Sequence, residues 1–226
     1  MERVQCVSLP RSGHNLLAGH LQRYFGSKAC CSKTGQQQKR LPFFGRRDQP
    51  TVPDSIPNAG FHYCEYYYAC RSHPCVDASN TFQKSHDFEL LMPVHQQQKY
   101  IIQKREPREL LISWFEMRLK KGREKDSQKG FADFVAKQQS YIDGFHAKWI
   151  DTPLQNRLVL DYDRYVMQPA ECMRDVISFF DPEGVPDQEK LEAVIADVRP
   201  AKNNSTFRYV DSHLPDLNGK ALASRR

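Results

Sequence analysis

The sequence predicts an α/β fold in three layers, with a central parallel β-sheet covered by helices on both faces. Short, apolar segments typical of buried strands alternate with longer segments whose apolar residues recur at helical spacing. In addition, a strand at the front of the chain passes through a tight turn directly into a helix. In a fold of this kind, ligands bind beyond the carboxyl ends of the strands.

Four segments have the length and apolar character of buried strands. We expect them at residues 4–9 (VQCVSL), 81–85 (TFQKS), 100–104 (YIIQK) and 157–161 (RLVLD). Helical spacing predicts five helices, the first closed by Gly26 and the second opened by Pro107. We expect these helices at residues 15–25, 107–121, 131–150, 169–180 and 187–198.

Two segments show neither pattern. Residues 27–60 contain three consecutive glutamines, paired arginines and several prolines, so we expect a long surface loop there. Residues 200–226 form a polar C-terminal segment. Because 226 residues suit one domain, the prediction is a single domain over residues 1–226.

The composition narrows the class of protein. The 33 Lys and Arg residues outnumber the 27 Asp and Glu residues, but a net charge of +6 suits a phosphorylated small ligand better than nucleic acid. No segment approaches the roughly 20 apolar residues of a membrane span, and the N-terminus lacks the apolar core of a signal peptide. We therefore expect a soluble, cytoplasmic protein with no membrane or nucleic-acid partner. Seven cysteines, an odd number, favour reduced thiols, and no sequence feature indicates an oligomeric state.

The turn at residues 10–15 (PRSGHN) is suited to hold an anion. The first N–H groups of the following helix lack partners within it, and the helix dipole attracts negative charge there. Gly13 permits close approach of the backbone, Ser12 and Asn15 offer side-chain donors, and the planar guanidinium of Arg11 matches phosphate or sulfonate. The alternative is a plain tight turn with an N-cap. The Walker A pattern G-x-x-x-x-G-K-[ST] is absent from the sequence, which disfavours an ATP or GTP hydrolase.

Two further segments, taken with this turn, resemble the signatures of the PAPS-dependent sulfotransferases. Arg105 follows the YIIQK segment, and Ser113 comes eight residues later on the next predicted helix. The stretch LVLDYDRYVMQPAECMRDVISFF is similar to the family's segment after a later strand. The resemblance extends over about residues 4–180. It implies the P-loop-like sulfotransferase fold and a donor, 3′-phosphoadenosine 5′-phosphosulfate (PAPS).

The resemblance also implies how the donor is bound. The turn would hold the 5′-phosphosulfate, Arg105 and Ser113 would bind the 3′-phosphate, and Tyr162 would lie near the adenine, with Asp163 structural. A basic C-terminal segment often closes on the 3′-phosphate in the family, a role that would fall to Arg208, although a solvated basic tail is the alternative. The implied donor-binding residues are Arg11, Ser12, Gly13, His14, Asn15, Leu16, Arg105, Ser113, Tyr162 and Arg208.

The implied catalytic residues centre on Lys84-Ser85-His86, which has the Lys-x-His form that cytosolic sulfotransferases carry just after a strand. By resemblance, His86 is the general base that takes the acceptor proton, and Lys84 steadies the sulfonate or the leaving group. Arg11 stands where cytosolic members have Lys and where Golgi-type and tyrosylprotein-type members have Arg. The alternative is a surface lysine beside a structural histidine.

Two positions depart from the family pattern. The common pattern has two hydroxyl residues after the glycine of the loop, whereas this chain has His14 and an amide. Either His14 binds the sulfonate when protonated, or it competes with His86 as the base. Leu16 replaces an aromatic residue that some members stack on the adenine, and Phe207 and Trp114 are the candidates to compensate.

A cluster of Cys, His and Tyr residues lies at residues 62–75 (HYCEYYYACRSHPC). Its spacing does not match the paired C-x2-C of structural zinc sites, and we expect no metal requirement. If zinc were bound, the ligands would be Cys64, Cys70, His73 and Cys75. Alternatively, Tyr66 and Tyr67 line an acceptor pocket together with His86, or Cys70 and Cys75 form a local disulfide.

The sequence therefore resembles the sulfotransferases. The reaction that this resemblance implies moves a sulfuryl group to a hydroxyl or amine of a small-molecule or carbohydrate acceptor. The reaction would be in-line, with a histidine base and no metal. A P-loop-type kinase is the alternative enzyme, but the Lys-Ser/Thr end of its loop is missing. The third hypothesis is a zinc- or nucleic-acid-binding module built on the Cys/His cluster.

Overall fold

The computed structural model describes residues 3–26, 28–29, 62–65 and 81–197. Their strands form one six-stranded sheet in the order β2-β3-β4-β1-β5-β6, and every neighbouring pair is parallel. The strands are β1 (Val4–Ser8), β2 (Lys28–Ala29), β3 (His62–Glu65), β4 (Phe82–Ser85), β5 (Lys99–Lys104) and β6 (Arg157–Asp161). The predicted parallel sheet is thus confirmed, and each of the four predicted strands is present to within one residue.

Two strands were not predicted. The two-residue β2 falls within the segment predicted as a loop, and β3 falls within the Cys/His-rich cluster. Both lie at one edge of the sheet, where β3 pairs with β4 and β2 pairs with β3. Neither segment has the apolar alternation by which strands are recognised in a sequence.

The helices alternate with the strands, as an α/β fold requires. They are α1 (His14–Phe25), α2 (Pro107–Lys120), α3 (Gln128–Phe145), α4 (Tyr162–Met167), α5 (Pro169–Phe180) and α6 (Gln188–Asp197). The helix α3 begins three residues earlier than predicted, because Ser127 caps it by accepting a hydrogen bond from the Gly130 N–H. It continues into a π-helical segment, His146–Asp151. The six-residue α4 was not predicted.

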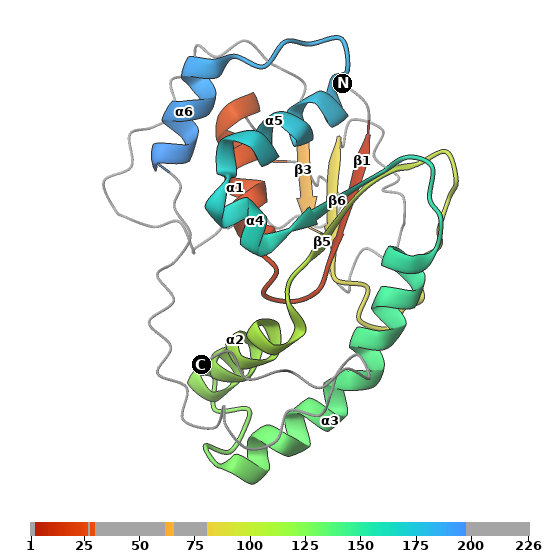
Figure 1. Cartoon of the computed structure of the whole chain (residues 1–226), viewed down its shortest axis with the longest axis vertical. Helices are drawn as coiled ribbons and strands as arrows, with labels where there is room; N and C mark the ends of the chain where they lie inside the picture. Colours follow the sequence, from red (N-terminus) through yellow and green to blue (C-terminus); the bar gives the residue numbers. More distant parts are fainter. Residues whose placement is uncertain (1–2, 27, 30–61, 66–80, 198–226) are drawn as a thin grey trace.

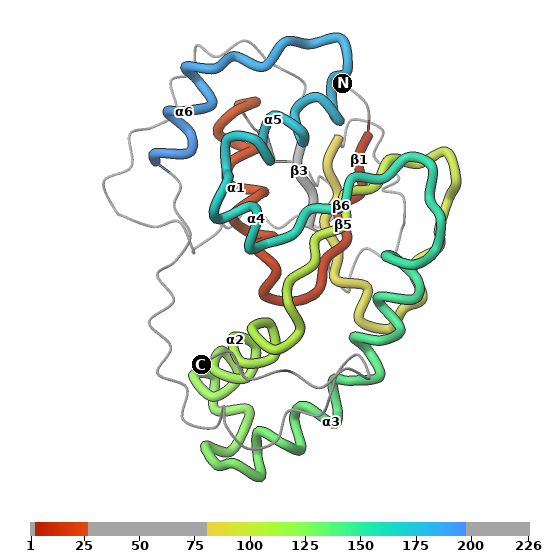
Figure 2. Tube along the Cα trace, viewed as in Figure 1, coloured from red at the N-terminus to blue at the C-terminus, as the bar shows by residue number. Residues whose placement is uncertain are grey.

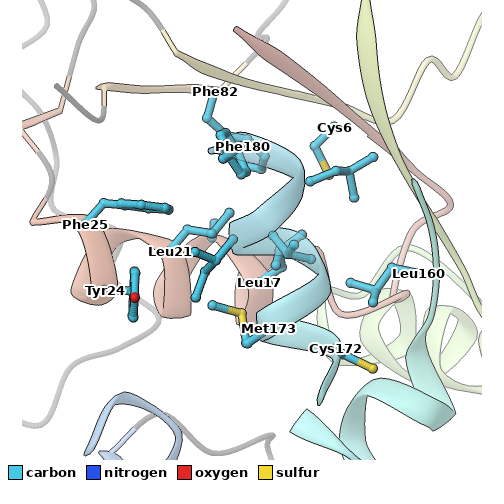
Figure 3. Packing of buried hydrophobic residues seen from close by; sticks show 14 of the residues in the cluster. Cys6, Leu17, Leu21, Tyr24, Phe25, Phe82, Leu160, Cys172, Met173 and Phe180 are labelled. Atoms are coloured by element: carbon cyan, nitrogen blue, oxygen red, sulfur yellow. The ribbon is translucent and has the colours of Figure 1, made fainter. Parts of the chain in front are cut away.

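One face of the sheet packs against α1, α5 and α6. Its core combines strand residues such as Cys6 and Phe82 with helix residues such as Leu17, Met173 and Phe180. Figure 3 shows these side chains pointing toward one another between β1, α1 and α5. The predicted layer of helices on this face is therefore present.

The opposite face packs against α2, α3 and the π-helical segment. Val7 and Ile102 come from β1 and β5 and belong to the same core cluster as Phe115, Phe134 and Trp149. Because successive residues of a strand point to opposite faces, Cys6 and Val7 enter different cores. Figure 1 shows α1, α4, α5 and α6 gathered on one side of the sheet, with α2 and α3 away from them. Three layers result, as predicted.

The parallel strands bring distant parts of the sequence together at the carboxyl-terminal end of the sheet. Figure 2 traces β1 into α1 and β5 into α2 at the same end of the sheet. The residues after β4 and β6 lie at this end too, because both strands run parallel to their neighbours. None of the described helices combines the length and the apolar character needed to cross a bilayer.

Candidate active site

The helix α1 begins at the carboxyl-terminal end of the sheet, and no side chain caps it. Gly13 precedes it in the left-handed conformation, with φ of 80°, and the first turn contains no acidic residue. The unbonded N–H groups and the positive end of the helix dipole therefore remain available to an anion. Arg11, a non-glycine residue, also has a positive φ of 65°. Strained backbone of this kind is concentrated at functional sites.

The loop before α1 presses against Tyr162, the first residue of α4. A Cβ atom on Gly13 would overlap the side chain of Tyr162, so only glycine fits there. The Arg105 guanidinium lies over the Tyr162 ring, 4.6 Å from its centre. Segments that follow β1, β5 and β6 therefore meet at one point.

Two arginines and a serine form a direct contact at this point. The Arg11 Nε donates to Ser113 Oγ at 3.1 Å, and an Arg105 Nη donates to the Arg11 carbonyl at 3.4 Å. Burial and the charge of Arg105 lower the pKa of Arg11. Among the described residues, Glu109 forms the ion pair with Arg105, at 3.8 Å. The site is therefore electropositive and suited to bind an anion.

Three buried polar atoms around the loop have no hydrogen-bond partner among the described residues. They are Ser12 Oγ, His14 Nε2 and Arg105 Nε. Leaving such a group unsatisfied costs about 1–3 kcal/mol. Because all three can donate, together they indicate a site suited to receive acceptor oxygens that the described residues do not supply.

A second group of side chains lies next to the loop, on β1 and β4. The Lys84 ammonium, whose side chain is nearly fully buried, donates to Asn15 Oδ1. The His86 Nδ1 lies 2.9 Å from the Ser8 carbonyl oxygen and 3.1 Å from Ser8 Oγ. The same hydroxyl contacts Nδ1 of His14, and the two imidazole rings are 5.2 Å apart. Burial, followed by the charges of Lys84 and His86, places the pKa of His14 well below its ordinary value.

The backbone that carries His86 is fixed by residues from α3 and the π-helical segment. The Tyr141 hydroxyl donates to the His86 carbonyl at 2.6 Å. Asp87 accepts from Lys148 Nζ at 2.8 Å and from Trp149 Nε1 at 2.9 Å. Sequence reasoning missed all of these supporting residues. The position of Asp87, directly after the Lys-x-His segment, was the one available signal.

An aromatic surface adjoins His86. The Phe88 ring, 47% exposed, lies 5.2 Å from the imidazole of His86 and 5.6 Å from the ring of Tyr141. Trp114 is buried behind Phe88, at 6.1 Å between ring centres. Trp114 belongs to the core on the α2 and α3 face, whereas Leu16 belongs to the core on the α1 and α5 face. Trp114 thus lies on the His86 side of the site.

Several residues that the sequence nominated lie outside the described part of the chain. These are Tyr66, Tyr67, Cys70, His73, Cys75, Phe207 and Arg208. The zinc candidate Cys64 lies in β3, with an undescribed side chain. Where side chains are described, no group of three or more His, Cys, Asp or Glu residues is arranged to hold a metal ion. The described cysteines Cys6 and Cys172 are free thiols.

Comparisons with known proteins point to one family. A family model described as the sulfotransferase domain matches residues 4–215. Similar solved structures include mouse sulfotransferase SULT7A1 in complex with PAP, which has 13% sequence identity and a TM-score of 0.53. That alignment covers 92% of this chain and 74% of the mouse chain, and it shows a shared fold. No curated protein sequence matches the chain.

Two bacterial structures are also similar. The sulfotransferase from Alicyclobacillus acidocaldarius is 15% identical with a TM-score of 0.47, and the alignment covers 88% of this chain and 94% of that chain. The sulfotransferase domain of the Synechococcus PCC 7002 olefin synthase is 16% identical with a TM-score of 0.46. Its alignment covers 95% of this chain and 81% of that chain.

Proposed function

Because the chain belongs to the sulfotransferase family, we propose that it transfers the sulfuryl group of PAPS to a hydroxyl or amine of a small-molecule or carbohydrate acceptor. The observation that carries this proposal is the set of buried donors without partners among the described residues, at the uncapped start of α1 and beside Arg11. The mouse relative with the shared fold binds PAP, the desulfated product, 3′-phosphoadenosine 5′-phosphate. Its ligand has the charge that this site is built to receive.

We assign the 5′-phosphosulfate to the loop at residues 11–16. The first N–H groups of α1, with Ser12 and His14, would donate to its oxygens. Arg105 and Ser113 would bind the 3′-phosphate, and Tyr162 would lie near the adenine. Their contacts with Arg11 and Gly13 support this, because one bound nucleotide would then touch all of these residues. Arg208, outside the described residues, keeps its proposed role at the 3′-phosphate.

We assign the general base to His86. A carbonyl oxygen only accepts hydrogen bonds, so the 2.9 Å contact with the Ser8 carbonyl requires the proton of a neutral His86 to be on Nδ1. The lone pair on Nε2 is then the one that takes the acceptor proton. His14 is the weaker candidate, because burial lowers its pKa and with it the driving force for proton transfer.

In the proposed step, the acceptor oxygen or nitrogen attacks sulfur as His86 removes its proton. The bond between sulfur and the bridging oxygen breaks, and the electron pair stays on that oxygen. Lys84 and Arg11 would stabilise the charge that grows there, since both cations border the loop. The exposed Phe88 beside His86 would contact the acceptor, with Tyr66 and Tyr67 proposed as further acceptor residues.

A transfer assay with sulfur-labelled PAPS and a panel of phenols, aliphatic alcohols, amines and oligosaccharides tests the proposed function. We expect label in one acceptor class and PAP formed in equal amount, without added metal. Lys120→Met serves as the control, because it removes an exposed cation from the far end of α2. Phosphoryl transfer from ATP, with no reaction of PAPS, would instead support the kinase hypothesis.

A further inference from the structure

Ser8, the last residue of β1, contacts both histidines of the site and was not nominated by the sequence. It is fully buried, and its carbonyl and hydroxyl oxygens both lie within hydrogen-bonding distance of His86 Nδ1. The hydroxyl also contacts Nδ1 of His14. One serine therefore joins the first residue of α1 to the residue that follows β4.

Counting protons on these contacts favours one arrangement. The proton of His86 Nδ1 points to Ser8, because the carbonyl there can only accept. Among the described residues, the Ser8 hydroxyl contacts the Nδ1 atoms of His14 and His86, so its proton has an acceptor only if His14 Nδ1 carries the lone pair. A proton on His14 Nδ1 would leave the buried hydroxyl proton without an acceptor among these residues. If His86 instead carried its proton on Nε2, the lone pair of its Nδ1 would face the lone pairs of the carbonyl oxygen. The two histidines thus carry their protons on different nitrogens.

This arrangement leaves an N–H group at Nε2 of His14. That atom is buried and has no partner in the described part of the chain. His14 is the first residue of α1, next to the backbone N–H groups that the uncapped helix leaves unbonded. An uncharged imidazole N–H at this position offers an anion one further hydrogen bond.

We propose that Ser8 is a positioning residue that sets the two histidines in different tautomers, so that His14 donates from Nε2 to an anionic oxygen of the bound phosphosulfate while His86 keeps its lone pair on Nε2. The inference rests on the proposed function, because it takes the donor to be PAPS. Each histidine then has one role, binding for His14 and proton removal for His86. Both roles depend on a serine that does not touch the substrates itself.

The tautomers are measured directly in the wild-type protein by long-range proton–nitrogen NMR correlation after labelling histidine with 15N. The signals are assigned with His14→Ala and His86→Asn. We expect the Nε2–H tautomer for His14 and the Nδ1–H tautomer for His86 at neutral pH. Addition of PAPS without acceptor should shift the His14 Nε2 resonance more than either nitrogen of any other histidine.

Kinetics of a double-mutant cycle provide a readout that a purely structural role would not produce. We expect Ser8→Ala to raise KM for PAPS about tenfold, the effect of one lost hydrogen bond. The double variant Ser8→Ala/His14→Ala should have the same KM as His14→Ala alone, because Ser8 acts through His14. Ser8→Thr, which keeps the hydroxyl, should restore the wild-type KM.

The outcomes separate this inference from the proposed function. An Nδ1–H tautomer or an imidazolium at His14 would overturn the inference, as would additive effects in the cycle. If calorimetry shows that PAPS binds and the His14 resonances do not move, the inference fails and the proposed function stands. If PAPS does not bind at all, both fail, whatever the tautomers.

Discussion

At the scale of single residues, the chemistry of the site is determined by which groups carry protons. The contact of His86 Nδ1 with a backbone carbonyl makes the tautomer independent of any other side chain. In contrast, the contact of His14 is with a hydroxyl, which donates or accepts. The two histidines are close in space, yet only His86 has the position of its proton fixed by the main chain.

The first prediction concerns the base. We expect His86→Asn to lower kcat about 10²–10⁴-fold, the usual contribution of general base catalysis, with little change in the affinity for PAP. Rapid-quench measurement of a single turnover, together with calorimetry for PAP, checks both parts. His95→Asn is the matched control, an exposed histidine on the connection between β4 and β5. If His14→Ala stops turnover and His86→Asn does not, the base is misassigned.

The second prediction concerns stability and pH. The pKa of His14 is lowered by burial and by Lys84 and His86, so the folded protein keeps it neutral while the unfolded chain takes up a proton below about pH 6.5. The folded state therefore has its full stability above that pH and loses stability as the pH falls. We expect urea unfolding to show that wild type loses about 1 kcal/mol more than His14→Gln between pH 8 and pH 5.5. Equal losses would contradict the assignment, since His146, whose pKa burial also lowers, is retained in both proteins.

At the scale of elements, the loop before α1 and the segment after β4 are held in different ways. The loop is fitted to its surroundings by shape, through Gly13 and Tyr162. The segment after β4 is held by polar contacts, because Asp87 binds Lys148 and Trp149 from the π-helical segment. Because one segment is held by shape and the other by polar contacts, we expect mutations in them to have different consequences.

The third prediction tests the fit of the loop. Gly13→Ala introduces a Cβ at positive φ and also overlaps Tyr162, so we expect at least a tenfold loss of affinity for PAP. Gly122→Ala is the matched control, because its φ of +63° imposes the same backbone strain while nothing lies within 4 Å of the added Cβ. It should cost about 1–2 kcal/mol of stability and leave PAP affinity unchanged. Calorimetry for PAP and urea unfolding of both variants distinguish strain from overlap.

The fourth prediction tests the polar support of the His86 segment. Asp87→Ala removes the carboxylate that pairs with the Lys148 ammonium, which keeps the carbonyls of Leu90 and Met92 as acceptors but loses its opposite charge. It also leaves the Trp149 N–H without its acceptor. We expect a loss of about 3–5 kcal/mol in urea unfolding, the cost of breaking a buried ion pair. The control is Asp133→Ala, which breaks an exposed i,i+4 pair with Lys129 and should cost less than about 0.5 kcal/mol. Similar losses in the two variants would show that the Asp87 contacts do not carry the stability assigned to them.

At the scale of the whole molecule, the order of strands and helices was readable in the sequence, but the contacts across it were not. The strands β1 and β5 were predicted from their apolar segments. In contrast, α4 has only six residues, too few for a helical period to be visible in the sequence. Lys84 and His86 were nominated by the resemblance of their segment to the Lys-x-His motif of the family. Ser8 and Tyr141 were missed because their contacts with His86 join residues 78 and 55 positions apart.

The fifth prediction concerns the nucleotide that stabilises the whole fold. PAP has a 3′-phosphate that AMP and ATP lack, and Arg105 with Ser113 lies close to the loop that would hold the 5′-phosphate. A ligand at 100 times its Kd stabilises the fold by about 2.7 kcal/mol, which for a chain of this length raises Tm by about 5–10 °C. We expect thermal unfolding to show this rise with PAP and a much smaller one with AMP or ATP.

Variants at the proposed 3′-phosphate site test whether one binding site holds both phosphates of the nucleotide. In Arg105→Met and in Ser113→Ala, the rise in Tm with PAP should fall to the value seen with AMP, while Lys120→Met keeps the full rise. Both ends of the nucleotide should be needed for the large effect, because in the proposed binding mode each phosphate would be bound by residues from the carboxyl end of a different strand. Equal stabilisation by PAP, AMP and ATP in the wild-type protein would mean that Arg105 and Ser113 do not bind a 3′-phosphate.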